Sequence, residues 1–159
     1  MLKYVDTKVT FAEVPDEISL CINISNCPNH CEGCHSPYLA EDIGTELTKD
    51  EIKKLYNANV GITCICFMGG DSNPEEVEEL SNFIRSTYTG IKTAWYSGKA
   101  DFDTLRIAYA FDYVKMGKYI EALGPLNSKT TNQRMFKVIC KGNKEFTLRD
   151  ITHKFNKDD

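Results

Sequence analysis

Long apolar runs, low-complexity tracts and linker-like stretches are all absent from this 159-residue sequence. Charged side chains occur throughout the first twenty residues, so we expect neither a secretory signal peptide nor a membrane-spanning segment. This expectation places the protein in the cytoplasm, without a membrane partner. Only three histidines are present, and they suggest no general acid–base pair, so the sequence assigns no catalytic side chain of that kind.

The length fits a single domain over residues 1–159, and 42% hydrophobic with 26% charged residues is typical of a soluble globular protein. A net charge of −4 gives no signal for nucleic-acid binding. One basic segment stands out, and two interpretations of it stay open: a solvated surface, or a docking face for an acidic partner or a carboxylate-bearing ligand. Between residues 115 and 144 the only acid is Glu121, and the basic residues are Lys115, Lys118, Lys129, Arg134, Lys137, Lys141 and Lys144.

The pattern of apolar residues predicts strands that alternate with helices, which is typical of βαβ units around a parallel sheet. A complete eightfold barrel of about 250 residues is too large for this chain. We therefore expect an α/β fold with a partial, open β/α barrel and a mostly parallel sheet. The expected strands are Ile18–Ser25, Ile62–Met68, Ile91–Ser97, Phe111–Met116 and Met135–Cys140, the expected helices begin at Thr48, after Asn73, at Phe102 and at about Thr147, and Gly117–Gln133 is expected to be irregular.

Local signals mark the starts of two of these helices. Thr48 and Glu51 have the spacing of a capping box, in which a threonine hydroxyl accepts a hydrogen bond from the third helical N–H. Asn73 is a favourable cap for the next helix, and Pro74 suits its first position because that position needs no N–H donor.

Seven cysteines need an explanation in such a chain. An odd number does not fit a complete disulfide framework, and a reducing compartment disfavours one. Three of them, Cys27, Cys31 and Cys34, fall within a segment whose prolines and glycine indicate a loop. The other four lie in apolar stretches, where a thiol usually behaves as a small buried hydrophobe: Cys21, Cys64, Cys66 and Cys140.

Thiolates at such short spacings let one loop wrap a compact metal centre, and they are the ligands that iron–sulfur clusters prefer. If only three cysteines bind a four-iron cluster, one iron keeps an open position, as catalytic metal sites do. Two other interpretations remain open at this stage. Zinc accepts three cysteines together with a histidine such as His30 or His35, and the spacing of Cys31 and Cys34 also occurs in redox dithiols.

The pattern Cys27-x3-Cys31-x2-Cys34, placed after the first expected strand, resembles the signature of the radical S-adenosylmethionine superfamily. The resemblance implies that these cysteines bind three irons of a 4Fe-4S cluster, and that the methionine end of S-adenosylmethionine binds the fourth. It further implies that one electron cleaves S-adenosylmethionine to methionine and a 5′-deoxyadenosyl radical. Gly33 and His35 would then flank the adenine.

A second motif, Gly69-Gly70-Asp71, follows the next expected strand. Because the carboxyl ends of parallel strands meet at one edge of a sheet, we expect this motif to lie beside the cysteine loop. It resembles the superfamily's Gly-Gly-Glu motif, which implies contact with the methionine amino group. Aspartate in place of glutamate shortens the reach by one methylene, and a Gly-Gly-Asp turn alone is a weak signal.

Further stretches narrow the resemblance to the activating protein of anaerobic (class III) ribonucleotide reductase; they are residues 31–35, 95–98, 124–125 and 131–134. The resemblance implies an enzyme that makes a glycyl radical. Its partners would be the large reductase subunit and a reduced flavodoxin- or ferredoxin-type electron donor. Two alternatives stay open: an activase of another glycyl radical enzyme, of the pyruvate formate-lyase type, and a non-catalytic zinc or iron–sulfur electron-transfer module.

Overall fold

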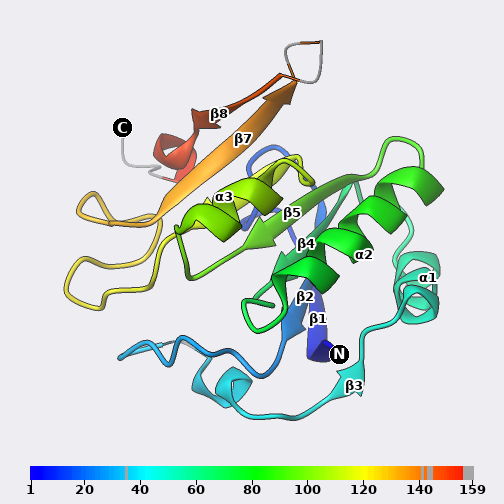
Figure 1. The fold of residues 1–159 in the computed structure, drawn as a ribbon, viewed down its shortest axis with the longest axis horizontal. Helices are drawn as coiled ribbons and strands as arrows, with labels where there is room; N and C mark the ends of the chain where they lie inside the picture. Colours follow the sequence, from blue (N-terminus) through cyan, green and yellow to red (C-terminus); the bar gives the residue numbers. More distant parts are fainter. Residues whose placement is uncertain (35, 141, 143–144, 156–159) are drawn as a thin grey trace.

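The chain folds around an eight-stranded sheet in the computed structural model, which describes residues 1–34, 36–140, 142 and 145–155. The strands are β1 (Lys3–Thr10), β2 (Ser19–Ile24), β3 (Thr45–Glu46), β4 (Cys64–Met68), β5 (Lys92–Tyr96), β6 (Tyr113–Met116), β7 (Arg134–Cys140) and β8 (Phe146–Asp150). The helices are α1 (Lys49–Ala58), α2 (Pro74–Thr87), α3 (Phe102–Ala108) and the short 3-10 turns η1 (Pro37–Ala40) and η2 (Thr152–Phe155). Figure 1 shows α2 and α3 lying across one face of the sheet. Of the helices described, none is both long and apolar enough to cross a bilayer.

The order of strands across the sheet is β3-β1-β2-β4-β5-β6-β7-β8. The four central strands, β2, β4, β5 and β6, are parallel neighbours, as predicted. Both flanks are antiparallel, with β3 and β1 on one side and β7 and β8 on the other. The prediction of a mostly parallel, partial β/α barrel is therefore wrong. Among the strands described, four pairings are antiparallel and three are parallel, in a mixed α/β fold.

The connections between strands explain the antiparallel flanks. Strand β1 was not predicted from the sequence. It returns into β2 through residues 11–18, a stretch too short for the crossover that parallel strands require. The described residues 117–133 between β6 and β7 contain no helix, so β7 comes back antiparallel to β6. The helix predicted at about Thr147 is also wrong. Thr147 lies in β8 and pairs with Ile139 of β7, because an edge hairpin satisfies the backbone there.

The predicted helix starts at Thr48, after Asn73 and at Phe102 are confirmed. The Thr48 hydroxyl accepts a hydrogen bond from the Glu51 N–H at 3.1 Å, and the Asn73 side chain accepts one from the Glu76 N–H at 3.4 Å. The Glu51 carboxylate does not complete the box by turning back to the cap. It accepts a 2.6 Å hydrogen bond from the hydroxyl of Tyr4, which ties α1 to β1.

Successive side chains of the central strands point to opposite faces of the sheet and form two apolar layers, one on each face. The larger layer lies under the helices and includes Phe67, Trp95 and Phe111, with the ring centroids of Trp95 and Phe111 5.6 Å apart. The opposite layer is covered by the connection from β1 to β2, by η2 and by irregular chain. That face is the one that opens into a cavity beside the cysteine loop.

Candidate functional site

The loops that follow the four parallel strands meet at one edge of the sheet. The cysteine loop leaves β2, the Gly69–Asp71 turn leaves β4, Ser97 and Gly98 follow β5, and Gly117 follows β6. Figure 1 shows the cysteine loop (light blue) and the long connection after β6 (yellow) projecting in the same direction from this edge. Since parallel strands place their carboxyl ends together, the sheet itself delivers these segments to one place.

The cysteine loop has a regular backbone feature that the sequence analysis did not predict. Each cysteine is preceded by a residue with positive φ: Asn26 (60°) before Cys27, His30 (46°) before Cys31, and Gly33 (73°) before Cys34. Left-handed backbone is costly for most residue types, and glycine, asparagine and histidine are among those that adopt it most often. The chain therefore adopts left-handed backbone just before each of the three thiols of this loop. In the sequence, the asparagine, histidine and glycine that precede the three cysteines were the signal for this left-handed backbone.

The three thiols of this loop are free and accessible to different degrees: Cys27 and Cys31 are half-buried and Cys34 is exposed. The Ser36 N–H lies 3.5 Å from the Cys34 sulfur and donates to it. Within the described residues, no three Cys, His, Asp or Glu side chains already stand close enough together to hold a metal ion. The donor set nevertheless fits an iron–sulfur cluster, because three partly exposed thiols share one loop.

Of the two residues expected to flank the adenine, the structure describes Gly33, and His35 lies outside the described residues. Gly33 faces the connection after β6, where a Cβ added to it would lie 2.6 Å from the Glu121 carboxyl carbon. The φ of +73° favours glycine here, whereas the exposed and flexible Glu121 side chain can move aside for a Cβ.

Asp71 is buried and makes three hydrogen bonds within the protein. Its Oδ1 accepts from the Ser97 hydroxyl at 2.6 Å, and its Oδ2 accepts from the Gly98 N–H and from Asn29 Nδ2, both at 2.7 Å. The predicted neighbourhood of the cysteine loop and the Gly-Gly-Asp turn is therefore confirmed by a direct hydrogen bond. A carboxylate has about four acceptor positions, so one on Oδ1 is left for a further donor.

Both glycines of the turn have positive φ, +109° at Gly69 and +98° at Gly70. A Cβ on Gly70 would lie 2.5 Å from Val77 Cγ2 of α2, so that position also needs glycine for packing. The carbonyl of Gly69 accepts a 2.8 Å hydrogen bond from Trp95 Nε1. The turn is therefore held by packing against α2 at Gly70 and by a hydrogen bond from β5 at Gly69.

Lys115 is a functional candidate that the sequence analysis did not assign. It lies at 7% exposure in β6, and its ammonium donates to the carbonyls of Ser97 (2.9 Å) and Gly117 (3.2 Å). The ammonium also lies 5.5 Å from the centroid of the Tyr96 ring. Burial lowers the pKa of Lys115 from 10.5 to about 8, although the nearby carboxylate of Asp71 and the thiols of the cysteine loop act in the opposite direction. In the sequence, the signal for this candidate was a lysine within the mostly apolar strand expected at Phe111–Met116.

A cavity of about 1110 Å³ opens beside this cluster of polar groups. Cys34, Lys115 and Tyr96 lie in its wall, together with Gln133, which is buried and donates to the Gly117 carbonyl at 3.3 Å. The volume is large enough for a drug-sized or cofactor-sized molecule, for which sites of about 300–1,000 Å³ are usual. The chain thus presents a thiol, an ammonium and an amide to one open space.

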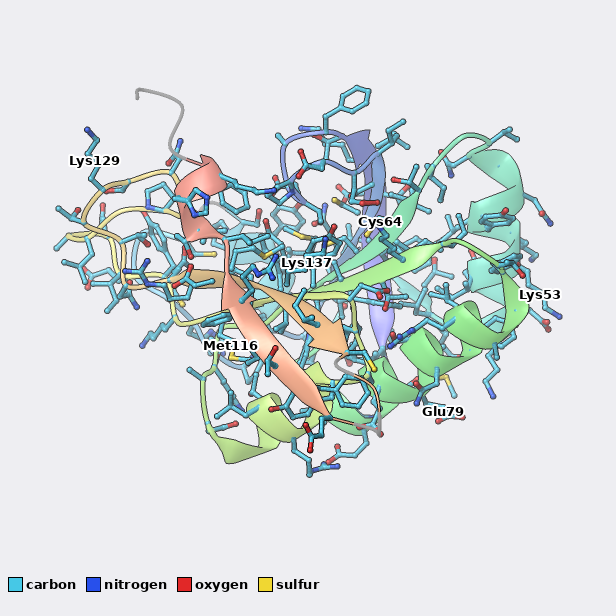
Figure 2. All side chains as sticks on the ribbon, turned by 90° about the horizontal axis from the view of Figure 1, so that it is seen from above. Lys53, Cys64, Glu79, Met116, Lys129 and Lys137 are labelled. Atoms are coloured by element: carbon cyan, nitrogen blue, oxygen red, sulfur yellow. The ribbon has the colours of Figure 1, made fainter. Side chains whose placement is uncertain are left out.

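The other cysteines divide into two kinds. Cys21, Cys64 and Cys66 are buried in the sheet, as predicted, and burial raises the pKa of the Cys66 thiol well above its ordinary value. Figure 2 shows Cys64 within the strands of the sheet. Cys140 is exposed at the end of β7, so the prediction that it is buried is wrong.

Of the five basic residues of this segment that the structure describes, three are exposed, Lys137 is half-buried and Lys115 is buried. Lys118, Lys129 and Arg134 are exposed, and Figure 2 shows Lys129 at the outer end of the connection between β6 and β7. Lys115 is instead buried at the sheet edge, and Lys141 and Lys144 lie outside the described residues. The charge run therefore combines exposed basic side chains with one buried ammonium at the sheet edge.

A protein-family model described as "4Fe-4S single cluster domain" matches residues 18–151, which includes the cysteine loop, the glycine turn and the four parallel strands. Searches of curated proteins and of solved structures returned no match.

Proposed function

The chain belongs to the 4Fe-4S single cluster domain family, and on that premise we propose that it is a radical S-adenosylmethionine activase that makes a glycyl radical on anaerobic ribonucleoside-triphosphate reductase. The family itself supports an iron–sulfur cluster. The specific activity rests on the sequence resemblance together with the arrangement of groups at the sheet edge.

The observation that carries the proposal is the cysteine loop. It has three thiols and no more, each directly after a left-handed residue, and it touches the Gly-Gly-Asp turn through the 2.7 Å bond between Asn29 and Asp71. A cluster held by three cysteines keeps one metal position for a small molecule, and the turn beside the loop offers groups that suit an amino acid. This combination favours a catalytic cluster over a closed structural site.

In this proposal Cys27, Cys31 and Cys34 hold the 4Fe-4S cluster, which when bound supplies one electron to cleave S-adenosylmethionine. Gly33 and His35 flank the adenine of S-adenosylmethionine. Asp71, Gly69 and Gly70 hold its methionine amino group.

The described geometry is compatible with that role for Asp71. Oδ1 of Asp71 has one acceptor position beyond its bond to Ser97, so it can take a hydrogen bond from an ammonium without losing a protein partner. Gly70, with its positive φ, lets the backbone come close to a ligand. The positive charge of the Lys115 ammonium lies near Asp71 and near the thiols of Cys27 and Cys31. It would offset the negative charge of the Asp71 carboxylate and of cluster-binding thiolates.

The cavity beside Cys34 is the place where we propose that the partner's glycine segment approaches. Lys115 and Gln133 are among the residues that line this cavity. We propose the large subunit of anaerobic ribonucleotide reductase as the partner, and a reduced flavodoxin- or ferredoxin-type protein as the electron donor.

The test is an anaerobic assay on reconstituted protein. Wild type should bind about four irons, release 5′-deoxyadenosine from S-adenosylmethionine after reduction, and give a glycyl radical signal by electron paramagnetic resonance once the reductase subunit is added. Alanine at Cys27, Cys31 or Cys34 should abolish all three results. Cys64→Ala is the matched control and should keep the cluster, since Cys64 lies buried inside β4.

Two results would contradict the proposal. A colourless protein with one tightly bound zinc would exclude the cluster. A protein with a reduced cluster that makes neither 5′-deoxyadenosine nor a glycyl radical, even with the reductase subunit present, would exclude the activase and leave electron transfer. If the glycyl radical formed only on a different glycyl radical enzyme, the proposed partner would be wrong and the proposed radical chemistry would stand.

A further inference from the structure

Asn29 is the one side chain of the cysteine loop whose amide bridges a cysteine and the sheet edge. Its Nδ2 lies 2.7 Å from Asp71 Oδ2 and 3.7 Å from the Cys27 sulfur. Asp71 lies 42 residues further along the chain and is anchored in turn by Ser97 and Gly98. The amide therefore connects a thiol of the loop after β2 to the ends of two other strands, β4 and β5.

The chemistry of the partners fixes the orientation of the amide. Ionised Asp71 can only accept hydrogen bonds, so the amide nitrogen and not its oxygen must face the carboxylate. An amide nitrogen carries two hydrogens. One is directed to Asp71 and the other is available to the sulfur of Cys27, within the distance at which sulfur accepts a hydrogen bond.

The packing around the amide is specific to this arrangement. A Cβ added to Gly98 would lie 2.5 Å from Asn29 Nδ2 and 3.3 Å from Asp71 Oδ2. Only glycine leaves room for the amide to reach the carboxylate at this point. Gly98, two residues after the end of β5, therefore leaves space for the Asn29 side chain of the cysteine loop.

We propose that Asn29 is a positioning residue, which anchors Cys27 to the sheet edge through Asp71 and donates an N–H to the Cys27 sulfur. The inference rests on the proposed function, in which Cys27 binds the cluster. Hydrogen bonds to cysteine sulfurs are one of the ways a protein sets the reduction potential of an iron–sulfur cluster. Partners outside the ligands also orient them, and their loss typically lowers metal affinity by about 10–100-fold.

The direction of the effect follows from charge. Reduction adds an electron, and an N–H donor stabilises the more negatively charged state. Removing the donor should therefore make the reduction potential more negative. It should also free the loop around Cys27, so that iron is lost more readily.

The experiment compares wild type with Asn29→Leu, which keeps the side-chain shape but has no N–H. Asn127→Leu is the matched control, because Asn127 is an exposed amide in the wall of the same cavity. The reduction potential is measured by titration followed with electron paramagnetic resonance, without S-adenosylmethionine. Iron release to a chelator is timed on the same samples.

We expect a more negative potential and about tenfold faster iron release for Asn29→Leu, with Asn127→Leu unchanged. Gly98→Ala should give the same shift, since its Cβ displaces the amide. An Asn29→Leu protein that folds by circular dichroism but retains no cluster, while Asn127→Leu retains it, also supports the anchoring role. A potential for Asn29→Leu equal to that of wild type would overturn the proposal.

The hydrogen bond can also be tested without the cluster. In the metal-free protein, the effects of Asn29→Leu and Asp71→Ala on urea unfolding should be non-additive, because each change removes the same contact. Additive effects would refute the anchor. If wild type binds no iron–sulfur cluster at all, the proposed function fails, yet this cycle still decides whether Asn29 holds the loop.

Discussion

Replacing Lys115 by methionine should change how the protein's stability depends on pH. Lys115 is 7% exposed, and burial lowers the pKa of its ammonium from 10.5 to about 8. The groups around it are the carboxylate of Asp71, the thiols of Cys27, Cys31 and Cys66, and the ring of Tyr96. A buried cation of this kind costs stability whenever it must stay protonated.

The sign follows from proton counting. Between pH 8 and pH 10.5 the folded protein has released the Lys115 proton and the unfolded chain still holds it, so stability rises with pH across that window. A shift of this size corresponds to about 3 kcal/mol in total. Between pH 7 and pH 9 the same linkage gives a gain of about 1 kcal/mol.

The assay is urea unfolding of wild type and Lys115→Met at pH 7 and at pH 9. Every other titrating group is common to both proteins, so the difference between them isolates Lys115. We expect wild type to gain about 1 kcal/mol relative to Lys115→Met on going to pH 9. Lys118→Met is the matched control, because Lys118 is an exposed lysine of the same segment.

The reasoning would be refuted if the difference in unfolding free energy between wild type and Lys115→Met were the same at both pH values. That result would mean that Lys115 keeps an ordinary pKa and is not desolvated. A pH-dependent difference of the same size for Lys118→Met would refute it equally, since the effect would then not depend on burial.

Two further changes test how the fold supports the site, each by urea unfolding. Thr48→Ala should lower the free energy of unfolding by about 1 kcal/mol because the Glu51 N–H loses its cap, whereas Thr48→Ser should keep it; equal loss in both would point to packing instead. Trp95→Phe should cost about 2 kcal/mol because the partly buried Gly69 carbonyl loses its 2.8 Å donor. A stability equal to wild type would mean that water replaces the indole N–H.

Predictions that depend on a few neighbouring residues agree with the structure. Caps at Thr48 and Asn73 form as their side chains suggest, because the hydrogen bond needs only a partner three residues away. The four central strands were also found, since nearly continuous apolar runs such as residues 62–68 are typical of strands buried on both faces.

Elements at the flanks of the sheet were harder to predict. β1 (Lys3–Thr10) is half exposed and rich in charge, so it lacks the apolar run that marked the central strands. β8 was taken for a helix, although its backbone pairs with β7. Whether such a segment is a strand depends on the neighbour that offers hydrogen bonds, and that neighbour is fixed by the whole fold.

The sequence by itself determined the spacing of Cys27, Cys31 and Cys34 and the positions of the glycines, and residues 18–151 match the 4Fe-4S single cluster domain family. Only the tertiary structure decided which distant side chains meet at the sheet edge. Asn29 contacts Asp71 across 42 residues, and Lys115 contacts the Ser97 carbonyl across 18. Residues close in sequence constrain each other through the local backbone, whereas these pairs meet because parallel strands bring their carboxyl ends together.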